Sequence, residues 1–185
     1  SFPVTTPFQN SANPQPIYVR IEDIDNGCLA FATFNLIVNP LPSIIDPSPL
    51  EICDDGVSDG ITTIDLTAKD TEITNGNSNY VVNYHYTLAN AQAGINPVPR
   101  PYNNTTQTEL LFVSITDIST GCINTTTLSV TVLDTPDIND ESQTINACEQ
   151  DDDGFETFDL TEVIDDVLQG LTNVTTTFHE TYPDA

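Results

Sequence analysis

The chain has 185 residues, of which 38% are hydrophobic, and its 28 acidic residues outnumber three basic ones for a formal net charge of −25. This charge repels phosphate backbones and anionic lipid headgroups, which excludes nucleic-acid binding and binding to a bare membrane. The 8 Phe and 6 Tyr supply enough apolar side chain for a folded core, and no run approaches the ~20 apolar residues of a membrane span, so direct membrane insertion is not expected.

Residues 1–41 contain two predicted strands, 17–23 and 30–38, joined by the sequence IDNGC. Both runs are alternating or β-branched, which is typical of half-buried strands. Gly27 supplies the positive φ that a tight turn needs, so this segment is expected to be a β-hairpin. The prolines of 39–49 then predict a semi-rigid connector to the next domain.

Residues 42–137 are predicted to form one complete β-sandwich. Its strands are expected at 61–66, 79–87, 110–117 and 125–133. Two short helical turns are expected between the strands: Thr67 begins the first, and Thr87 caps the second, which Gly94 ends. A second connector, 134–142, leads into the last segment.

A repeat of about 94 residues organises the chain. The sequences IYVRIEDIDNGC and LFVSITDISTGC place Cys28 and Cys122 94 residues apart, and IDLT and FDLT recur with the same offset. The expected fold class is all-β, with tandem immunoglobulin-like or fibronectin-like β-sandwich repeats. Residues 1–41 form the C-terminal half of one repeat, 42–137 a complete repeat, and 138–185 the N-terminal half of the next. A half repeat leaves strand edges and core unpaired, so it needs the rest of its unit to fold.

The four cysteines predict disulfides, because no C-x-x-C pair supports a zinc or dithiol redox site. In a Greek-key sandwich the first strand begins at the end where the last hairpin turns, which predicts a bridge between Cys53 and Cys122. Cys28 and Cys148 then have partners outside the chain. The alternative joins Cys28 to Cys53 and Cys122 to Cys148 across the connectors. Disulfides imply an oxidising compartment.

Acidic clusters follow the first cysteine of each repeat and end at a glycine. They comprise Asp54, Asp55 and Asp59 in the central repeat and Asp151, Asp152 and Asp153 in the next. Several carboxylates in a short loop suit calcium, and Asp117 in the hairpin turn is expected to complete the site of its own unit. The spacing is not that of an EF-hand, because Leu160 stands where the bidentate Glu belongs. The alternative is a solvated acidic turn that needs no ion.

The two histidines, His85 and His179, occupy equivalent positions in successive repeats. Neither has a Ser or Cys nucleophile matched to it by spacing, so a structural role is predicted for both. No nucleophile, base and orienting group are assembled in the sequence, and no enzymatic activity is expected.

The combined pattern CDDGVSDG…IDLT, NYVVNYHYTLANAQAGINP and LLFVSITDISTGC…LSVTV resembles the tandem repeats of very large surface proteins of gliding Bacteroidetes. Those proteins are exported by the type IX secretion system and carry a type B sorting domain, and the best-known members are gliding-motility adhesins. The resemblance implies a secreted, filamentous adhesin on the surface of a Gram-negative bacterium, acting as a stalk and an adhesive array. The implied partners are surface polysaccharide or the substratum, outer-membrane motility or secretion proteins, and neighbouring repeats.

Two other functions fit the same sequence. Calcium-dependent carbohydrate-binding repeats would present an exposed aromatic residue at equivalent positions of successive units. Accessory repeats of a secreted enzyme would adjoin a catalytic domain elsewhere in the gene. Tyr18 and Phe112 match in register but are expected to belong to the core.

Overall fold

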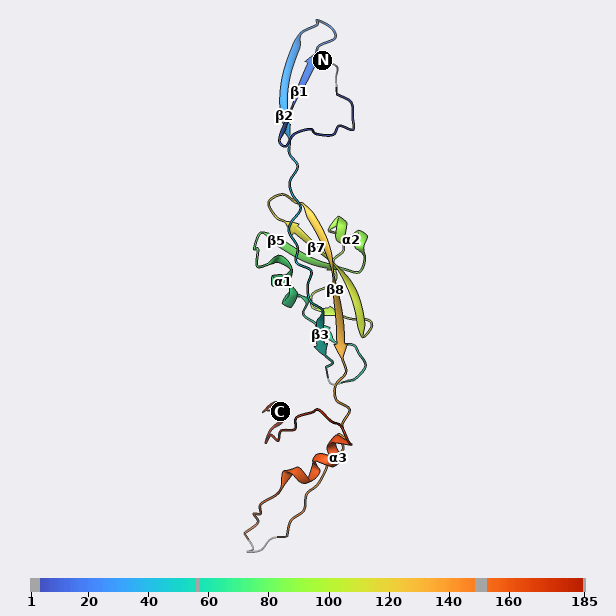
Figure 1. The fold of residues 1–185 in the computed structure, drawn as a ribbon, viewed down its shortest axis with the longest axis vertical. Helices are drawn as coiled ribbons and strands as arrows, with labels where there is room; N and C mark the ends of the chain where they lie inside the picture. Colours follow the sequence, from blue (N-terminus) through green and yellow to red (C-terminus); the bar gives the residue numbers. More distant parts are fainter. Residues whose placement is uncertain (1–3, 56, 149–152, 185) are drawn as a thin grey trace.

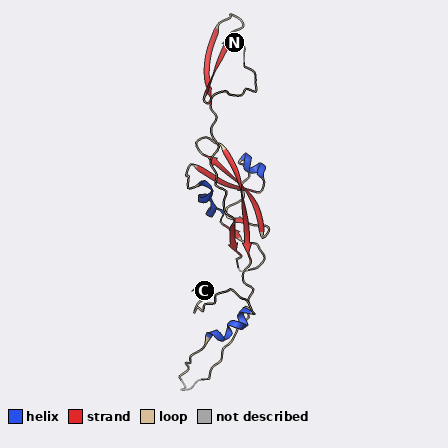
Figure 2. Cartoon of the chain, in the orientation of Figure 1, coloured by secondary structure: helices blue, strands red, loops and turns tan. Residues whose placement is uncertain are grey.

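The computed structural model describes residues 4–55, 57–148 and 153–184. A hairpin, a central unit and a C-terminal segment follow one another along the long axis of the chain (Figure 1). Strands are the main regular structure, and the helices are few and short (Figure 2). In the part of the chain that is described, no helix combines the length and the apolar character needed to cross a membrane.

The N-terminal hairpin pairs β1 (Gln15–Glu22) antiparallel with β2 (Leu29–Leu36). In its turn the N–H of Asp23 donates to the carbonyl of Cys28 over 2.9 Å, and Gly27 has a φ of 73°. A residue with a Cβ rarely adopts this conformation, so the glycine of IDNGC makes the turn possible. The hairpin expected from the sequence is confirmed.

The central unit is built on a four-stranded sheet of order β3-β8-β7-β5. Its strands are β3 (Leu50–Cys53), β5 (Tyr80–His85), β7 (Thr108–Asp117) and β8 (Ile123–Leu133). The last three strands pair antiparallel. The edge strand β3 instead runs parallel to β8, with Leu50 opposite Val130 and Cys53 opposite Leu133. The sequence analysis missed β3, because four residues are too few to show a period.

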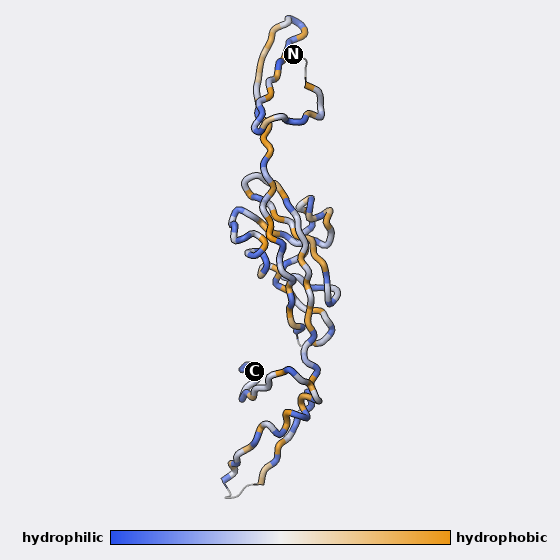
Figure 3. Tube along the Cα trace, in the orientation of Figure 1, coloured by the Kyte–Doolittle hydropathy of each residue, from blue (hydrophilic) through white to orange (hydrophobic). Residues whose placement is uncertain are grey.

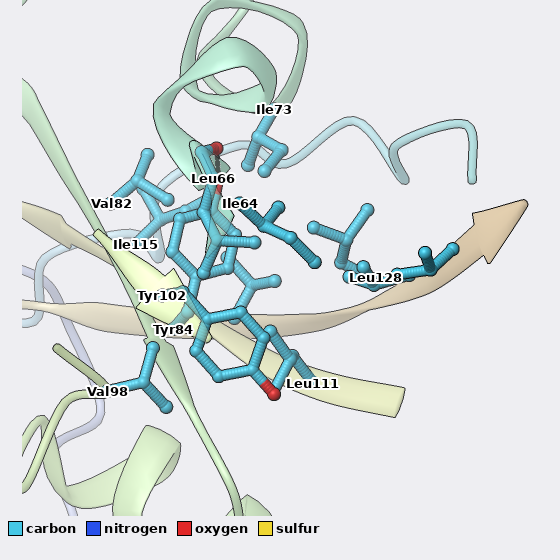
Figure 4. Packing of buried hydrophobic residues seen from close by; sticks show 13 residues of the cluster. Ile64, Leu66, Ile73, Val82, Tyr84, Val98, Tyr102, Leu111, Ile115 and Leu128 are labelled. Atoms are coloured by element: carbon cyan, nitrogen blue, oxygen red, sulfur yellow. Dashed lines mark hydrogen bonds between the residues drawn. The ribbon is translucent and has the colours of Figure 1, made fainter. Parts of the chain in front are cut away.

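A second layer covers one face of this sheet. It consists of the short ladder β4 (Thr63–Ile64) with β6 (Tyr102–Asn103), the 3-10 turn η1 (Leu66–Lys69) and the helix α1 (Asp70–Thr74). Between the layers lies the core, drawn in Figure 4 and made of Ile64, Leu66, Ile73, Val82, Tyr84, Val98, Tyr102, Leu111, Val113, Ile115, Leu128, Val130 and Val132. The fold is β-rich as expected. The second layer holds one two-stranded ladder and no full sheet, so an immunoglobulin-type sandwich is not shown.

The opposite face of the sheet carries the helix α2 (Leu88–Ala93) (Figure 1). The Thr87 side chain accepts a hydrogen bond from the N–H of Asn90 over 3.2 Å, and Gly94 ends the helix with a φ of 64°. Both ends therefore agree with the sequence analysis. The first helical turn differs, because its N-cap is Asp65, which accepts a hydrogen bond from the N–H of Thr67 over 2.9 Å.

Strand alternation also decides which aromatic residues enter the core. Leu111 and Val113 point into the core, so Phe112 between them points to the opposite face, where it is half-buried. Its counterpart Tyr18 is 78% exposed. The expectation that both are core residues was wrong.

The described part of the C-terminal segment repeats the helical part of the second layer of the central unit. The turn η2 (Leu160–Val163) and the helix α3 (Ile164–Leu168) lie 94 residues after η1 and α1, and η3 (Tyr182–Asp184) follows. Asp159 caps η2 as Asp65 caps η1.

Equivalent positions differ sharply in burial between the units. Leu160 is 47% exposed, whereas its counterpart Leu66 is 1% exposed, and Phe34 in β2 is 50% exposed, whereas Leu128 in β8 is fully buried. Apolar residues, orange in Figure 3, accordingly recur along both end segments as well as through the central unit. The end segments carry core-type residues without the elements that cover them in the central unit.

Candidate functional site

The two cysteines of the central unit mark its opposite ends. Cys53 is the last residue of β3 and pairs with Leu133, the last residue of β8, whereas Cys122 directly precedes β8. The 11 residues of β8 therefore separate them, a length of roughly 36 Å at about 3.3 Å per residue. We call the end with Cys122 the N-terminal pole and the end with Cys53 the C-terminal pole.

This geometry corrects the predicted bridge. A disulfide requires Cα atoms within about 7 Å, so Cys53 and Cys122 cannot be joined in this fold. The prediction placed the first strand near the last hairpin, but β3 pairs with the far end of β8. The alternative pairs are not brought together either: Cys28 lies in the turn of the hairpin β1–β2, directly before β2, Cys148 follows the second connector, and both are free. All four cysteines are free, and Cys28, Cys53 and Cys148 are exposed.

The turn at the N-terminal pole is closed by an aspartate. Asp117 accepts hydrogen bonds from the N–H and the hydroxyl of Ser119, over 2.8 and 2.6 Å, and from the N–H of Thr120 over 3.3 Å. These bonds, first that from the Ser119 hydroxyl, hold the pKa of Asp117 below its ordinary value. Asp117 lies at the pole opposite the acidic loop of its own unit, so it does not complete the calcium site that the sequence predicted there.

The acidic loop at the C-terminal pole uses its carboxylates to bind its own backbone. Asp54 is buried and accepts hydrogen bonds from the N–H of Gly60 over 2.7 Å and from the N–H of Asp55 over 2.8 Å. Asp59 accepts one from the N–H of Ile61 over 2.8 Å. The loop is therefore ordered by side-chain to backbone bonds of the kind that form Asx turns.

The described carboxylates do not converge on a point. Nowhere in 4–55, 57–148 and 153–184 do three or more His, Cys, Asp or Glu side chains lie close enough together to hold a metal ion. Asp151 and Asp152 fall outside the described residues, and Asp153 accepts a hydrogen bond from the N–H of Phe155 over 2.9 Å. A calcium role for these loops rests on the sequence pattern alone.

His85 is a structural residue. It is fully buried, with Nδ1 2.9 Å from the carbonyl oxygen of Ile95 and Nε2 2.9 Å from the hydroxyl of Ser114. The ring thus joins β5 to β7 and to the segment after α2. His179 is exposed, with Nε2 2.8 Å from the Thr177 hydroxyl.

A polar cluster that the sequence analysis missed lies beside α1. The hydroxyl of Tyr84 is 2.8 Å from both the carbonyl of Leu66 and the carboxylate of Asp70. The Arg100 guanidinium donates to the carbonyl of Val82 over 2.7 Å, pairs with Asp70 over 3.4 Å, and lies 5.2 Å from the Tyr84 ring centroid. Burial, followed by the bond with Asp70, raises the pKa of Tyr84.

The Tyr84 cluster is not repeated in the following unit. Its counterparts 94 residues later are Ile164 for Asp70 and Phe178 for Tyr84, neither of which can form the same bonds. Asp70 is 14 residues from Tyr84 and 30 residues from Arg100 in the sequence, so no local motif reveals the cluster. With its polar groups paired internally, we interpret the cluster as a stabilising contact.

The first connector is docked on the central unit. Ser48 donates its N–H to Glu72 over 2.6 Å, and Lys69 bonds Glu72 over 2.9 Å and the Ser48 hydroxyl over 2.7 Å. The bond from the Ser48 N–H, followed by that from Lys69, lowers the pKa of Glu72 to about 2. These bonds hold the first connector against the central unit at Ser48.

These features define a class of protein: a β-rich repeat module whose connectors join it at opposite poles and which carries a cysteine at each pole. The chain belongs to the family of Flavobacterium inter-domain disulphide bond domains, which matches residues 1–42, 49–136 and 144–185. The three matched segments are separated by parts of the two connectors. No curated protein and no solved structure matches the chain.

Proposed function

We propose that this chain is a repeat segment of a secreted, filamentous cell-surface adhesin, in which the units act as a structural stalk and an adhesive array. One observation carries the proposal: the connectors join the central unit at opposite poles. Residues 39–49 arrive beside the N-terminal pole, and the chain leaves β8 at Leu133, at the C-terminal pole (Figure 1). Units connected in this way extend along a line.

The family supports covalent ties between neighbouring units. Its name refers to an inter-domain disulphide bond, and the exposure of Cys28, Cys53 and Cys148 is compatible with such bonds. We propose that such bonds form between successive units after export, in an oxidising extracellular compartment. A stalk tied in this way resists separation of its units under load.

The adhesive and motile parts of the proposal rest on the resemblance to gliding-motility adhesins. The array would be exported by type IX secretion, contact outer-membrane motility or secretion proteins at its base, and bind surface polysaccharide or the substratum through many weak contacts. The net charge of −25 keeps neighbouring filaments apart by mutual repulsion.

Small-angle X-ray scattering on arrays of two, four and six complete units tests the stalk. The largest dimension of the particle is expected to rise by a constant increment per unit. A matched array whose second connector, 134–142, is replaced by a Gly/Ser sequence of equal length is expected to be shorter at every unit number. Compact particles whose largest dimension rises much more slowly than the unit number would reject the stalk.

Adhesion is tested on cells that produce the parent protein with its natural, a reduced and an increased number of units. Antibodies against residues 42–137 are expected to label the outside of intact cells, and attachment to polysaccharide-coated glass is expected to fall as units are removed. Attachment that is independent of unit number, with normal surface labelling, would reject the adhesive role and leave the stalk intact.

A further inference from the structure

An open hollow on the central unit lies between the helix α1, with the turn that follows it, and the edge strand β5. Its volume is about 390 Å³, and Arg100 also contributes to its wall. Both α1 and β5 lie on the same side of the central unit (Figure 1). Small-molecule sites have volumes of about 300–1,000 Å³, so the hollow is large enough for a small ligand.

The α1 side of the hollow carries polar groups that the fold does not use. Thr71 and Ser78 are exposed, and within the described residues neither hydroxyl has a hydrogen-bond partner. The side-chain oxygen of Asn77 accepts a hydrogen bond from the N–H of Asn79 over 3.0 Å, which orients the amide and leaves its NH2 group to donate. Since a hydroxyl both donates and accepts, this side can bond either kind of polar group.

The pair of Asp70 and Arg100 lines the hollow as well and keeps spare bonding capacity. The Tyr84 hydroxyl is 2.8 Å from one oxygen of Asp70, and Arg100 is 3.4 Å from the other. A carboxylate and a guanidinium each have more bonding positions than these contacts occupy. The side chains of Arg100 and Asp70 are 36% and 31% exposed, so a ligand in the hollow can reach the unused positions.

These charged groups are held in place before a ligand binds. Thr74 donates its hydroxyl to the carbonyl of Asp70 over 2.8 Å. The Arg100 guanidinium lies over the Tyr84 ring and donates to the carbonyl of Val82 over 2.7 Å. A group that is already fixed loses little conformational entropy on binding. The bonds that stabilise the Tyr84 cluster therefore also preorganise the wall of the hollow.

The β5 side adds an aromatic surface. Tyr80 lines the hollow and is half-buried against the core. A tyrosine ring has a broad apolar face and a polar tip. A wall that combines such a ring with hydroxyls, an amide and a paired carboxylate suits a ligand with C–H surfaces edged by hydroxyls. A sugar ring has this chemistry.

The charge of the hollow favours a neutral ligand. Among the described residues that line it, the charged ones are Asp70 and Arg100, which pair with each other. The net charge of −25 repels anionic ligands at longer range. A neutral sugar meets neither obstacle, and its hydroxyls both donate to acceptors and accept from donors.

The helical segment does not require this polar lining in order to fold. In the following unit Leu171 is the counterpart of Asn77, and Val174 is the counterpart of Tyr80. The helix α3 nevertheless forms there, as α1 does in the central unit. The polar lining is therefore a property of the central unit and not a condition of the repeat.

We propose that the hollow between α1 and β5 binds a neutral hexose unit of a polysaccharide. Asn77, Thr71 and Ser78 bond the sugar hydroxyls from one side, and the unused positions of the Asp70–Arg100 pair bond them from below, while the ring packs against Tyr80. The proposal rests on the proposed function, because it names the surface through which the adhesive array contacts polysaccharide. A single site of this kind is weak, and repetition along a filament strengthens attachment.

Nuclear magnetic resonance titration of the nitrogen-15-labelled 185-residue chain tests the site. The probes are neutral tetrasaccharides of glucose, mannose and galactose, each added to about 10 mM, with tetragalacturonate as the acidic comparison. At least one neutral probe is expected to cause saturable shifts of the amide signals of 70–82 and of Arg100. No saturable shift with any neutral probe, shifts centred on another part of the chain, or tighter binding of tetragalacturonate in the hollow would overturn the proposal.

Matched double variants locate the binding energy. Thr71→Ala with Ser78→Ala removes two hydroxyls that have no partner in the described residues, and it is expected to raise the dissociation constant of the bound probe at least about tenfold without changing the melting temperature. Thr127→Ala with Ser129→Ala is the control. It makes the same chemical change on the opposite face of the sheet, because Leu128 between them points into the core.

The control is expected to keep the dissociation constant within about twofold of the unchanged chain. Ser78→Gln, which obstructs the hollow from an exposed position, is a second variant that is expected to weaken binding. Equal dissociation constants in the unchanged chain, the Thr71/Ser78 variant and Ser78→Gln would reject the site.

The cell-attachment experiment separates this proposal from the proposed function. Absence of binding in the hollow, together with attachment that falls as units are removed, rejects the sugar site and keeps the adhesive role. Binding in the hollow, together with attachment that is independent of unit number, keeps the sugar site and rejects the adhesive role.

Discussion

At the scale of the residue, the neighbours of His85 explain its structural role. Both ring nitrogens are engaged, by the carbonyl of Ile95 and the hydroxyl of Ser114, and the ring has no exposed surface. The counterpart His179 has the same sequence register but lies on the surface of a half unit. The two residues therefore form a natural pair for comparison.

We predict that His85→Ala lowers the free energy of unfolding of the central unit by about 3 kcal/mol, because it removes buried volume and leaves the buried hydroxyl of Ser114 without its imidazole partner. Urea unfolding followed by circular dichroism measures the loss. His179→Ala is the control and is expected to change the free energy of unfolding by less than about 0.5 kcal/mol. Equal losses in both variants would contradict a role set by burial.

The carboxylate of Asp54 is a second residue whose role depends on burial. We predict that Asp54→Ala costs about 1–3 kcal/mol of stability, because the N–H of buried Gly60 loses its acceptor. Asp59→Ala, in the same loop but exposed, is the control and is expected to cost less than about 1 kcal/mol. Thermal unfolding of both variants in calcium and in excess chelator separates the two interpretations of the loop. A deficit of Asp54→Ala that appears only in calcium would contradict a hydrogen-bonding role.

At the scale of the element, β2 and β8 are equivalent strands in different surroundings. Leu128 in β8 is covered by the second layer, whereas Phe34 in β2 has no such cover and is 50% exposed. Hydrophobic stabilisation is proportional to the apolar area removed from water, so the larger residue contributes less here.

We predict that Leu128→Ala destabilises the central unit by about 2–5 kcal/mol, and that Phe34→Ala leaves its unfolding unchanged within about 0.5 kcal/mol. Both values come from urea denaturation of the 185-residue chain, monitored on the central unit by tyrosine fluorescence. When the preceding unit is completed, Phe34→Ala should become costly for that unit. An unchanged, small cost there would mean that the two strands are not equivalent.

The contact between the first connector and the central unit contributes a stability that depends on pH. Glu72 accepts the Ser48 N–H, and its pKa falls from the ordinary 4.5 to about 2. A carboxyl with a depressed pKa in the folded state stabilises the fold above its ordinary pKa, and the contribution is lost as the pH falls from about 4.5 toward 2.

We predict that Glu72→Gln lowers the melting temperature at pH 7 and that its difference from the unchanged chain disappears near pH 2. Asp166→Asn, at the equivalent position 94 residues later, is the control and is expected to show no such convergence. Melting curves at pH 7, 4 and 2 measure the difference in melting temperature between each variant and the unchanged chain. A Glu72→Gln difference of the same size at pH 7 and pH 2 would contradict the linkage.

At the scale of the whole molecule, the 94-residue repeat occurs as one complete unit, 42–137, and two partial units, 1–41 and 138–185. Among the residues that the structure describes, only the central unit contains both layers, whereas the end segments expose residues whose counterparts form its core. Isolated two-stranded hairpins are only marginally stable in water, since too little apolar surface is covered.

We predict that backbone amides of β7 and β8 exchange with deuterium at least about 100-fold more slowly than those of β1 and β2 in the 185-residue chain. Hydrogen exchange followed by mass spectrometry resolves the two hairpins. In an array that completes the preceding unit, protection of β1 and β2 should rise to that of β7 and β8. Strong protection of β1 and β2 without completion would contradict the assignment of residues 1–41 as a half unit.

Local chemistry and periodicity could be predicted from the sequence alone. The 94-residue repeat, the turn at Gly27 and the helix between Thr87 and Gly94 depend on neighbours within a few residues, or on self-similarity, and both can be recognised in a linear sequence. The structural role of His85 also followed, because its sequence offered no partner for catalysis.

Only the tertiary structure decided the rest, because it depends on pairings between distant residues. Four residues of β3 carry no period, yet their parallel register with β8 places Cys53 and Cys122 at opposite poles and rules out the predicted bridge. The same register removes Asp117 from the acidic loop of its own unit. Burial is equally non-local: Phe34 and Leu128 hold the same place in the repeat, and the presence of a covering layer alone determines which one enters a core.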